Sequence, residues 1–234
     1  KIKMGSIIFT TQKALDLLFS GDTELWSIVL ISFSVSIKAI LLSTPLAMLL
    51  AFALNYSGLP GKKLIITLFN SFLSVPTVVI GLFVYVLLTR QGPFGNLELL
   101  FSQRAMVIGQ VILCFPILVA LGFSAIRAAD PRLWETSSTL GVPIWYTILT
   151  VFYEVRYGLF AAVITAFGRI ISEVGISMMV GGNIMGYTRN ITTAIALETS
   201  KGEFAQGIAL GIILLLLSFI LTTFLSYIQG KREF

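Results

Sequence analysis

Long apolar stretches alternate with short polar ones along most of the chain. A helix needs about 20 apolar residues to cross the hydrocarbon core of a bilayer. Five stretches are long enough to do so: 25–56, 64–89, 105–126, 157–180 and 208–228. Because backbone polar groups in lipid must bond within their own segment, such spans are helical. The pattern therefore predicts an all-α, polytopic membrane protein with about five transmembrane helices, as one membrane domain over 1–234.

The stretch before the first span has a different pattern. Between residues 6 and 19, apolar side chains recur at helical spacing but are interrupted by Thr10, Gln12 and Asp16. This pattern is typical of an amphipathic helix lying in the plane of the membrane. No cleavable signal peptide is expected here. A sixth span in this position is the alternative.

Prolines occur inside three of the predicted spans, at Pro45, Pro76 and Pro116. Proline removes a backbone hydrogen bond, and membrane helices tolerate it where neighbouring helices or water satisfy the freed groups. One interpretation is that these residues only bend helices for packing. The other is that the segment 74–77 opens the backbone beside a transport pathway.

Two features lie between the fourth and fifth spans. Residues 191–197 are apolar but too few to cross the membrane, so a surface or re-entrant helix is expected. Residues 200–203 fit a capping box, with Ser200 as the N-cap and Glu203 three positions later. We therefore expect the last span to begin there.

One polar segment, 130–143, lies between the third and fourth spans. It begins with Asp-Pro, an N-cap followed by a first-turn proline, and it ends with Gly141 and Pro143, which commonly follow a helix. The segment is predicted to form one short, exposed helix outside the bilayer, with Glu135 near its middle. A simple turn between spans does not need such a helix, so contact with a partner is expected.

Composition supports the membrane class and narrows the chemistry. Of the 234 residues, 56% are hydrophobic and only 12% are charged, unlike a soluble domain. The chain has no histidine and one cysteine, Cys114, which excludes histidine-dependent catalysis, the usual zinc sites and an internal disulfide. No catalytic residue, metal or cofactor is predicted. The net charge of +5 is interpreted as basic residues flanking spans, not as a nucleic-acid surface.

The basic residues do not settle the orientation by number. If the segment 130–143 lies in the cytosol, equal numbers of basic residues fall on the two sides of the membrane. The short turn with Lys62 and Lys63 and the tail with Lys231 and Arg232 favour this choice under the positive-inside rule. We therefore place the N-terminus outside and the C-terminus inside.

Two ionisable residues lie deep in the fourth predicted span. Arg169 and Glu173 are four positions apart, so both lie on one face of a helix and can pair. Charges at such depth are costly and face protein or water. They form either a self-neutralising pair that fixes packing, or a site where Arg169 attracts an anion. Lys38, in the first span, is expected to extend to the interface or to meet a partner carboxylate.

Several blocks of sequence resemble a known family. Glu135, Thr136 and Gly141 are in register with the Glu-Ala-Ala-x-x-x-Gly signature of the membrane subunits of bacterial ABC importers. Tyr153 and Glu154 replace the Leu-Pro ending of that signature. Other blocks resemble permeases of molybdate, sulfate and tungstate importers: 92–95, 154–159, 167–175, 178–184 and 192–202. Of these, 154–159 and 192–202 are closest to the tungstate type.

The resemblance implies a type I ABC importer-like fold and a homodimer in a prokaryotic cytoplasmic membrane. It implies two cytosolic ATPase subunits and an extracytoplasmic oxyanion-binding protein, with tungstate as the cargo and molybdate or sulfate as alternatives. The segment 130–143 would be the coupling helix, with Leu133 and Trp134 supplying apolar contact. The residues expected to couple to the ATPase are Asp130, Arg132, Leu133, Trp134, Glu135, Thr136 and Gly141. The residues expected at the translocation pathway or gate are Pro76, Arg169, Glu173 and Asn183.

Two other classes of function fit a membrane chain: a histidine-free membrane enzyme and a stand-alone anion channel. An enzyme needs a nucleophile with a base, or paired carboxylates, whereas Glu173 lies beside its own arginine. A channel would not need a coupling helix. Residues 58–63 lack the spacing and the Ser/Thr of a phosphate-binding loop, so ATP is expected to be hydrolysed by a different chain.

Overall fold

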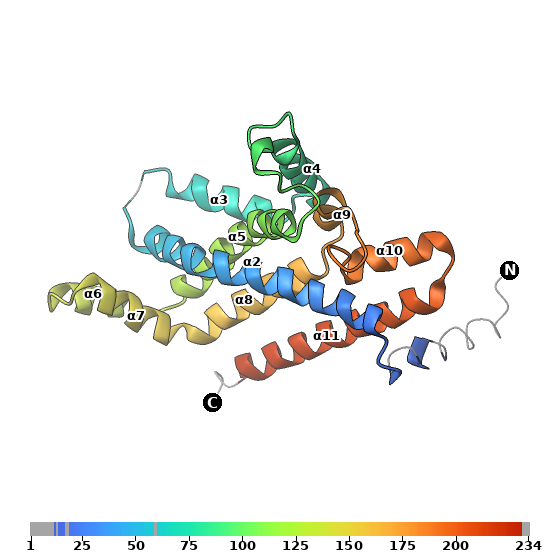
Figure 1. The fold of residues 1–234 in the computed structure, drawn as a ribbon. Helices are drawn as coiled ribbons and strands as arrows, with labels where there is room; N and C mark the ends of the chain where they lie inside the picture. Colours follow the sequence, from blue (N-terminus) through green and yellow to red (C-terminus); the bar gives the residue numbers. More distant parts are fainter. Residues whose placement is uncertain (1–11, 13, 17–18, 59, 231–234) are drawn as a thin grey trace.

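The computed structural model describes residues 12, 14–16, 19–58 and 60–230, and every regular element among them is helical (Figure 1). In chain order the elements are α2 (Thr23–Tyr56), α3 (Lys62–Phe72), α4 (Thr77–Leu88), the short 3-10 helix η1 (Gly95–Leu97), α5 (Gln103–Arg127), α6 (Pro131–Thr139), α7 (Ile144–Glu154), α8 (Arg156–Ile171), α9 (Gly175–Gly181), α10 (Ile191–Lys201) and α11 (Phe204–Gly230). Most of the amphipathic helix predicted for 6–19 lies outside the described residues.

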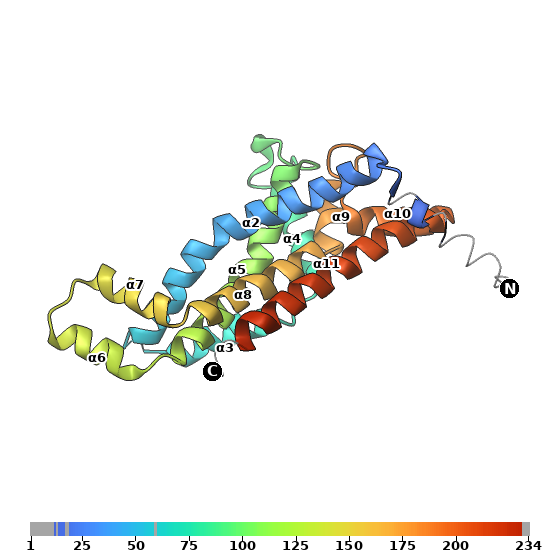
Figure 2. The ribbon, with the colours of Figure 1, turned by 90° about the horizontal axis from the view of Figure 1, so that it is seen from below.

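Helices α2 and α5 form the centre of the fold and run in the same direction. Ser43 Oγ lies 2.9 Å from Cys114 Sγ, and further along both helices the Asn55 side chain donates to the Phe123 carbonyl at 3.1 Å. Their side chains form the main apolar core, to which α4, α8 and α9 also contribute. Figure 2 shows α6 and α7 at one end of the molecule, and α10 with the start of α2 at the other.

Among the described residues, three helices are long and apolar enough to cross a membrane on their own: α2, α5 and residues 204–227 of α11. Two bent pairs pass the same test together, α3 with α4 at an angle of 99° and α7 with α8 at 74°. The prediction of an all-α fold with about five transmembrane helices is therefore confirmed when each bent pair counts as one span.

Two predicted spans follow a different course from the one expected. The stretch 64–89 is not one straight helix, because α3 ends at Phe72 and α4 begins at Thr77 in a new direction. The stretch 157–180 is interrupted between Ile171 and Gly175, and the bent pair that could cross the membrane joins α8 to α7 instead of α9. The length of an apolar stretch does not predict these interruptions, because the backbone can turn within such a stretch.

The capping box predicted for the start of the last span, with Ser200 as N-cap, is wrong. Ser200 and Lys201 belong to the last turn of α10, and Gly202 follows with a φ of 82°. That left-handed conformation suits glycine and ends the helix. The capping box of this region lies at the start of α10, where the Asn190 side chain accepts a hydrogen bond from the Thr193 amide at 3.0 Å.

The first turn of the short helix α10 is buried, whereas its last residues, 199–201, are exposed. Ile191 packs with Leu25 and Leu210 in a second apolar cluster shared by α2, α10 and α11. The rest of α11 remains open, since Leu215 and Phe219 are 72% and 70% exposed. An exposed apolar face on a helix of this length suits contact with acyl chains.

Candidate functional site

The short helix α6 has well-defined ends and lies at one end of the molecule (Figure 2). The Asp130 carboxylate accepts a hydrogen bond from the Arg132 amide at 2.9 Å. Gly141 follows the helix with a φ of 67°, and the Val142 amide donates to the Ser137 carbonyl at 3.0 Å. These contacts satisfy backbone groups that a helix end otherwise leaves unpaired, so α6 is fixed without deep burial.

The outer side of α6 carries residues predicted to contact a partner. Arg132, Glu135 and Thr136 are exposed. None of the ion pairs found among the described residues uses Glu135. An exposed carboxylate on a rigid helix is available to a basic partner surface.

Trp134 packs against α2 instead of lying on the exposed side of α6. Its ring stacks on Tyr56 at the end of α2, with centroids 4.4 Å apart and planes inclined by 19°. Phe52 lies 4.8 Å from Tyr56 and 6.0 Å from Trp134, and Phe152 of α7 lies 6.0 Å from Phe52. The sequence predicts Trp134 as an apolar contact for a partner, whereas the structure uses it in this aromatic cluster to join α6 to α2.

Sequence reasoning did not select the apolar side chains that are exposed next to α6. Leu140, Trp145 and Tyr146 are 73%, 66% and 64% exposed, respectively. Their only signal in the sequence is a pair of aromatic residues soon after Pro143, which also fits the start of a span. They and Glu135 are exposed on α6, on α7 and on the turn between these helices, and a mixture of polar and apolar groups is usual at protein interfaces.

Two of the helix breaks meet in space. α4 begins directly after Pro76, and α9 begins at Gly175. A Cβ at Gly175 would lie 2.9 Å from Val78 Cγ2 and 3.2 Å from Glu173 Oε1. The start of α4 therefore lies against the start of α9, and Pro76 and Glu173 are brought into one region. We call this region the break site.

Glu173 is the buried charge of the break site, with its side chain 2% exposed. Its Oε1 accepts a hydrogen bond from the Ile176 amide at 3.2 Å, and its Oε2 lies 3.7 Å from Arg169 Nη1. The Arg169 side chain is 43% exposed. The pair thus has one buried member that binds the backbone and one accessible member whose guanidinium can meet an anion.

Buried polar side chains that sequence reasoning missed hold the break site together. Thr192 Oγ1 donates to the Glu173 carbonyl at 2.7 Å, and Asn190 Nδ2 lies within hydrogen-bonding distance of Ser177 Oγ, at 2.9 Å. All three of these polar side chains are buried. Short polar residues scattered in an apolar sequence have no periodicity, so no pattern could have identified them.

Asn183 lies apart from the break site, because α9 separates it from Glu173. Its φ is 52°, and its Oδ1 is buried with no hydrogen-bond partner in the described part of the chain. Within that same part, no group of three or more His, Cys, Asp or Glu residues is placed to hold a metal ion. The structure therefore brings Pro76, Arg169 and Glu173 together and leaves Asn183 at the other end of α9.

Known proteins similar to this chain are transport permeases. The chain is 37% identical over 218 residues to the tungstate uptake system permease protein TupB of Peptoclostridium acidaminophilum. This alignment covers 93% of the chain and 96% of that protein. The chain is 40% identical over 218 residues to TupB of Campylobacter jejuni, covering 90% and 88%. The molybdenum transport system permease protein ModB of Escherichia coli is 29% identical over 219 residues, covering 88% and 96%. No protein-family model matches the chain.

Solved structures with a similar fold are ABC transporters. A chain of the bacterial alginate ABC transporter, in complex with an alginate pentasaccharide-bound periplasmic protein, has a TM-score of 0.73 at 16% identity and covers 99% of this chain and 90% of its own. A chain of an amino acid ABC transporter has a TM-score of 0.61 at 14% identity, covering 99% of both. These structures show the fold alone. The identity to the two TupB proteins shows the family: the chain belongs to the tungstate uptake branch of the ABC transporter permeases.

Proposed function

We propose that this chain is the membrane-spanning permease subunit of an ATP-driven importer that carries tungstate across a prokaryotic cytoplasmic membrane. Two copies of the chain form the pathway, two cytosolic ATPase subunits hydrolyse ATP, and an extracytoplasmic binding protein delivers the ion. The observation that carries the proposal is the identity of 37% and 40% to two tungstate uptake permeases. Molybdate and sulfate are the alternative cargoes, because more distant relatives are named for their transport.

The energetics of the cargo agree with ATP-driven import. Tungstate is a dianion, and moving two charges against a potential of 100 mV costs about 4.6 kcal/mol. A hundredfold accumulation adds about 2.8 kcal/mol. A passive channel would release the anion from a cell with a negative interior. Because residues 58–63 do not match a phosphate-binding loop, we assign ATP hydrolysis to the partner subunits.

We assign α6 to the contact with the ATPase. Arg132, Glu135 and Thr136 are exposed on it. The aromatic cluster joins α6 to α2, so a displacement of α6 is passed to the longest helix of the chain. Asp130 and Gly141 fix the helix ends, Trp134 connects the helix to α2, and Leu133 is assigned to apolar contact with the partner.

We assign the break site to the translocation pathway or its gate. Interrupted membrane helices are tolerated where they line protein or a water-filled cavity, and such interruptions mark substrate sites in transporters. Arg169 provides the accessible positive charge, and Glu173 fixes the backbone of the break. Pro76 immediately precedes α4, the second helix of the bent pair α3–α4. We assign Asn183, which follows α9, to the gate as well.

Reconstitution tests the proposed function. The chain is placed in lipid vesicles with candidate ATPase and binding-protein partners, and the uptake of labelled tungstate is followed. Uptake that requires both ATP and the binding protein supports the proposal. Flux without ATP would identify a channel, and hydrolysis of a lipid or peptide by the chain alone would identify an enzyme. In competition at equal concentrations, we expect tungstate to displace the label better than molybdate or sulfate does.

Replacing Arg169 by glutamine is expected to lower tungstate uptake by a factor of about ten or more, because a hydrogen bond to a charged group contributes about 1.5 to 3 kcal/mol. The initial uptake rate is the measurement. Arg169→Lys, which keeps the charge, should retain more of the rate. Arg90→Gln removes an exposed positive charge outside the break site and should leave the rate unchanged.

A double variant separates the two roles that Arg169 could have. If Arg169 only neutralises Glu173, then combining Arg169→Gln with Glu173→Gln restores uptake, because no unpaired buried charge remains. If Arg169 attracts the anion, uptake stays low in the double variant, and this is the result we expect. The amount of membrane-inserted protein is measured for each variant, so that loss of folding is recognised.

A further inference from the structure

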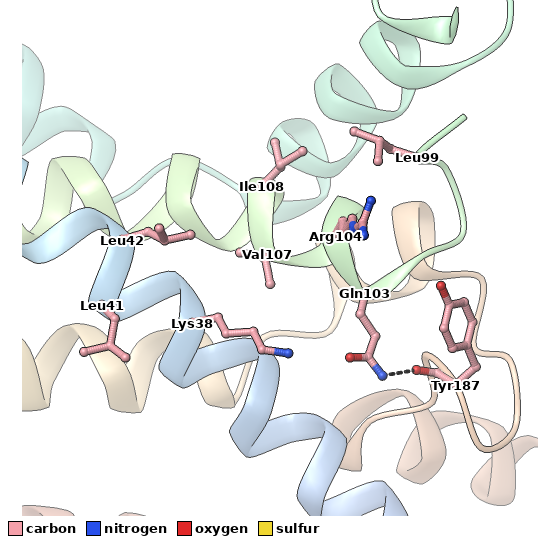
Figure 3. Close-up of a pocket in the computed structure, with 9 residues that line it drawn as sticks. All are labelled: Lys38, Leu41, Leu42, Leu99, Gln103, Arg104, Val107, Ile108 and Tyr187. Atoms are coloured by element: carbon pink, nitrogen blue, oxygen red, sulfur yellow. Dashed lines mark hydrogen bonds between the residues drawn. The ribbon is translucent and has the colours of Figure 1, made fainter. Parts of the chain in front are cut away.

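A cavity of about 710 Å³ lies between α2, α5 and the loop that contains Tyr187. Its lining includes none of the residues of the break site or of α6. Figure 3 shows Lys38 extending from α2 toward the first turn of α5, where Gln103 and Arg104 lie. The cavity is therefore a second feature of the membrane domain, which the proposed transport function does not use.

One end of this cavity is polar and positively charged. Lys38 and Arg104 are both exposed side chains that line it. None of the ion pairs in the described part of the chain involves either residue. Gln103 Nε2 donates to the Tyr187 carbonyl at 2.7 Å and holds the loop at the rim. Two like charges at one cavity repel each other, and an anion between them removes that repulsion.

The other end of the cavity is apolar. Leu41 and Leu42 follow Lys38 by about one helical turn on α2, Val107 and Ile108 follow Arg104 by about one turn on α5, and all four line the cavity. Leu41 and Leu42 are 67% and 61% exposed. The cavity thus pairs a positively charged layer with an apolar layer, and it matches a ligand with a negative head and a hydrocarbon tail.

The position of the charged layer fits the edge of the hydrocarbon core. α5 has 25 residues, so at about 1.5 Å per residue it is about 37 Å long, slightly more than a hydrocarbon core of about 30 Å. Arg104 lies in its first turn and Arg127 in its last. Arg104 therefore lies at the headgroup level opposite α6, Lys38 extends toward that level from deeper along α2 (Figure 3), and Leu41 and Leu42 lie one turn deeper than Lys38, among the acyl chains.

We propose that this cavity binds an anionic phospholipid, with the phosphate between Lys38 and Arg104 and an acyl chain along Leu41 and Leu42. Basic pockets between membrane helices bind anionic headgroups in this way. A small inorganic dianion would leave the apolar layer uncovered. If a second copy of the chain occupied the cavity instead, it would have to supply carboxylates to pair with Lys38 and Arg104. The proposal concerns the lipid alone and does not depend on the identity of the transported ion.

Native mass spectrometry of the full chain in detergent tests the proposal. Phosphatidylglycerol or phosphatidylcholine is added, and the lipid retained per chain is measured. The test variant combines Lys38→Gln with Arg104→Gln. The control variant combines Lys63→Gln with Arg90→Gln, which removes the same charge at exposed sites outside the cavity. We expect the test variant to lose phosphatidylglycerol affinity about fivefold for each charge removed, and the control to keep it.

Three outcomes would overturn the proposal. The first is equal retention of phosphatidylglycerol by the test and control variants. The second is loss of dimers in the test variant with lipid retention unchanged, which would identify a contact between copies. The third is loss of tungstate binding by the chain with lipid retention unchanged, which would identify an anion site.

A second variant keeps the proposal testable if the double substitution prevents folding. Leu42→Trp places a fluorophore in the apolar layer without removing a charge. Brominated lipids quench tryptophan on contact, so the signal added by Leu42→Trp is followed in vesicles that contain one brominated lipid. Brominated phosphatidylglycerol should quench it at least twofold more than brominated phosphatidylcholine does. Equal quenching by the two lipids would contradict the proposal.

Discussion

Glu135→Lys is expected to abolish ATP-dependent uptake while the chain still inserts in the membrane. Glu135 is exposed on a helix whose ends are fixed by capping, so its replacement does not disturb the core. Truncating one partner of an interfacial charge pair costs about 2 to 5 kcal/mol, and a reversed charge adds repulsion. At about 3 kcal/mol, the affinity for the ATPase subunits falls roughly a hundredfold. Co-purification of those subunits and ATP hydrolysis stimulated by the loaded binding protein are the two measurements.

The matched control for this variant is Glu154→Lys. Glu154 is exposed at the end of α7, outside α6, and its replacement changes the net charge by the same amount. We expect this variant to couple normally. Full coupling in Glu135→Lys, or an equal loss in both variants, would show that α6 does not contact the ATPase through Glu135.

Trp134→Ala is expected to separate ATP hydrolysis from transport. The substitution removes the ring that stacks on Tyr56 at 4.4 Å, while Glu135 on the outer side of α6 is unchanged. The ATPase subunits should still bind, but their movement should no longer reach α2. We expect uptake per ATP hydrolysed to fall about tenfold, which corresponds to about 1.4 kcal/mol of lost coupling. Uptake and phosphate release are measured in the same vesicles.

Two further variants show whether the loss comes from the aromatic cluster. Trp134→Phe keeps an aromatic ring and should preserve most of the uptake per ATP. Trp26→Ala removes a tryptophan that is 44% exposed near the start of α2, far along that helix from Tyr56, and should have no effect on coupling. A normal ratio of uptake to ATP hydrolysis in Trp134→Ala would remove the cluster from the mechanism.

The course of the straight spans could be predicted from the sequence, whereas the course of the spans that turn could not. α2, α5 and α11 follow the predicted ranges closely, because a long apolar stretch has few alternatives to a helix in lipid. The turns near Pro76 and Glu173 change direction inside apolar stretches, and their geometry depends on contact between α4 and α9. Proline marked the first turn, whereas no residue type marked the second.

The candidate site divides in the same way. The ends of α6 are local, so Asp130 and Gly141 predict them. The inward position of Trp134 depends on Tyr56, which is remote in sequence and comes close only through the tertiary fold. Lys38 and Arg104 belong to separate predicted spans, and they share a cavity because α2 and α5 are parallel neighbours. Local rules reach contacts within one helix, whereas contacts between helices require the fold.

The length of α2 has a geometric consequence. It is one helix of 34 residues even with Pro45 inside it, and at about 1.5 Å per residue it is about 51 Å long. Its C-terminal end is held by the stacked rings of Tyr56 and Trp134, and its first turns pack against α10 and α11. Pivoting about the C-terminal end by about 5° would carry the opposite end through about 4 Å. A small rotation at the end near α6 would then become a larger displacement at the opposite end of the helix. In the proposed importer, the nucleotide state of the ATPase would thereby change the shape of the permease on the other side of the membrane.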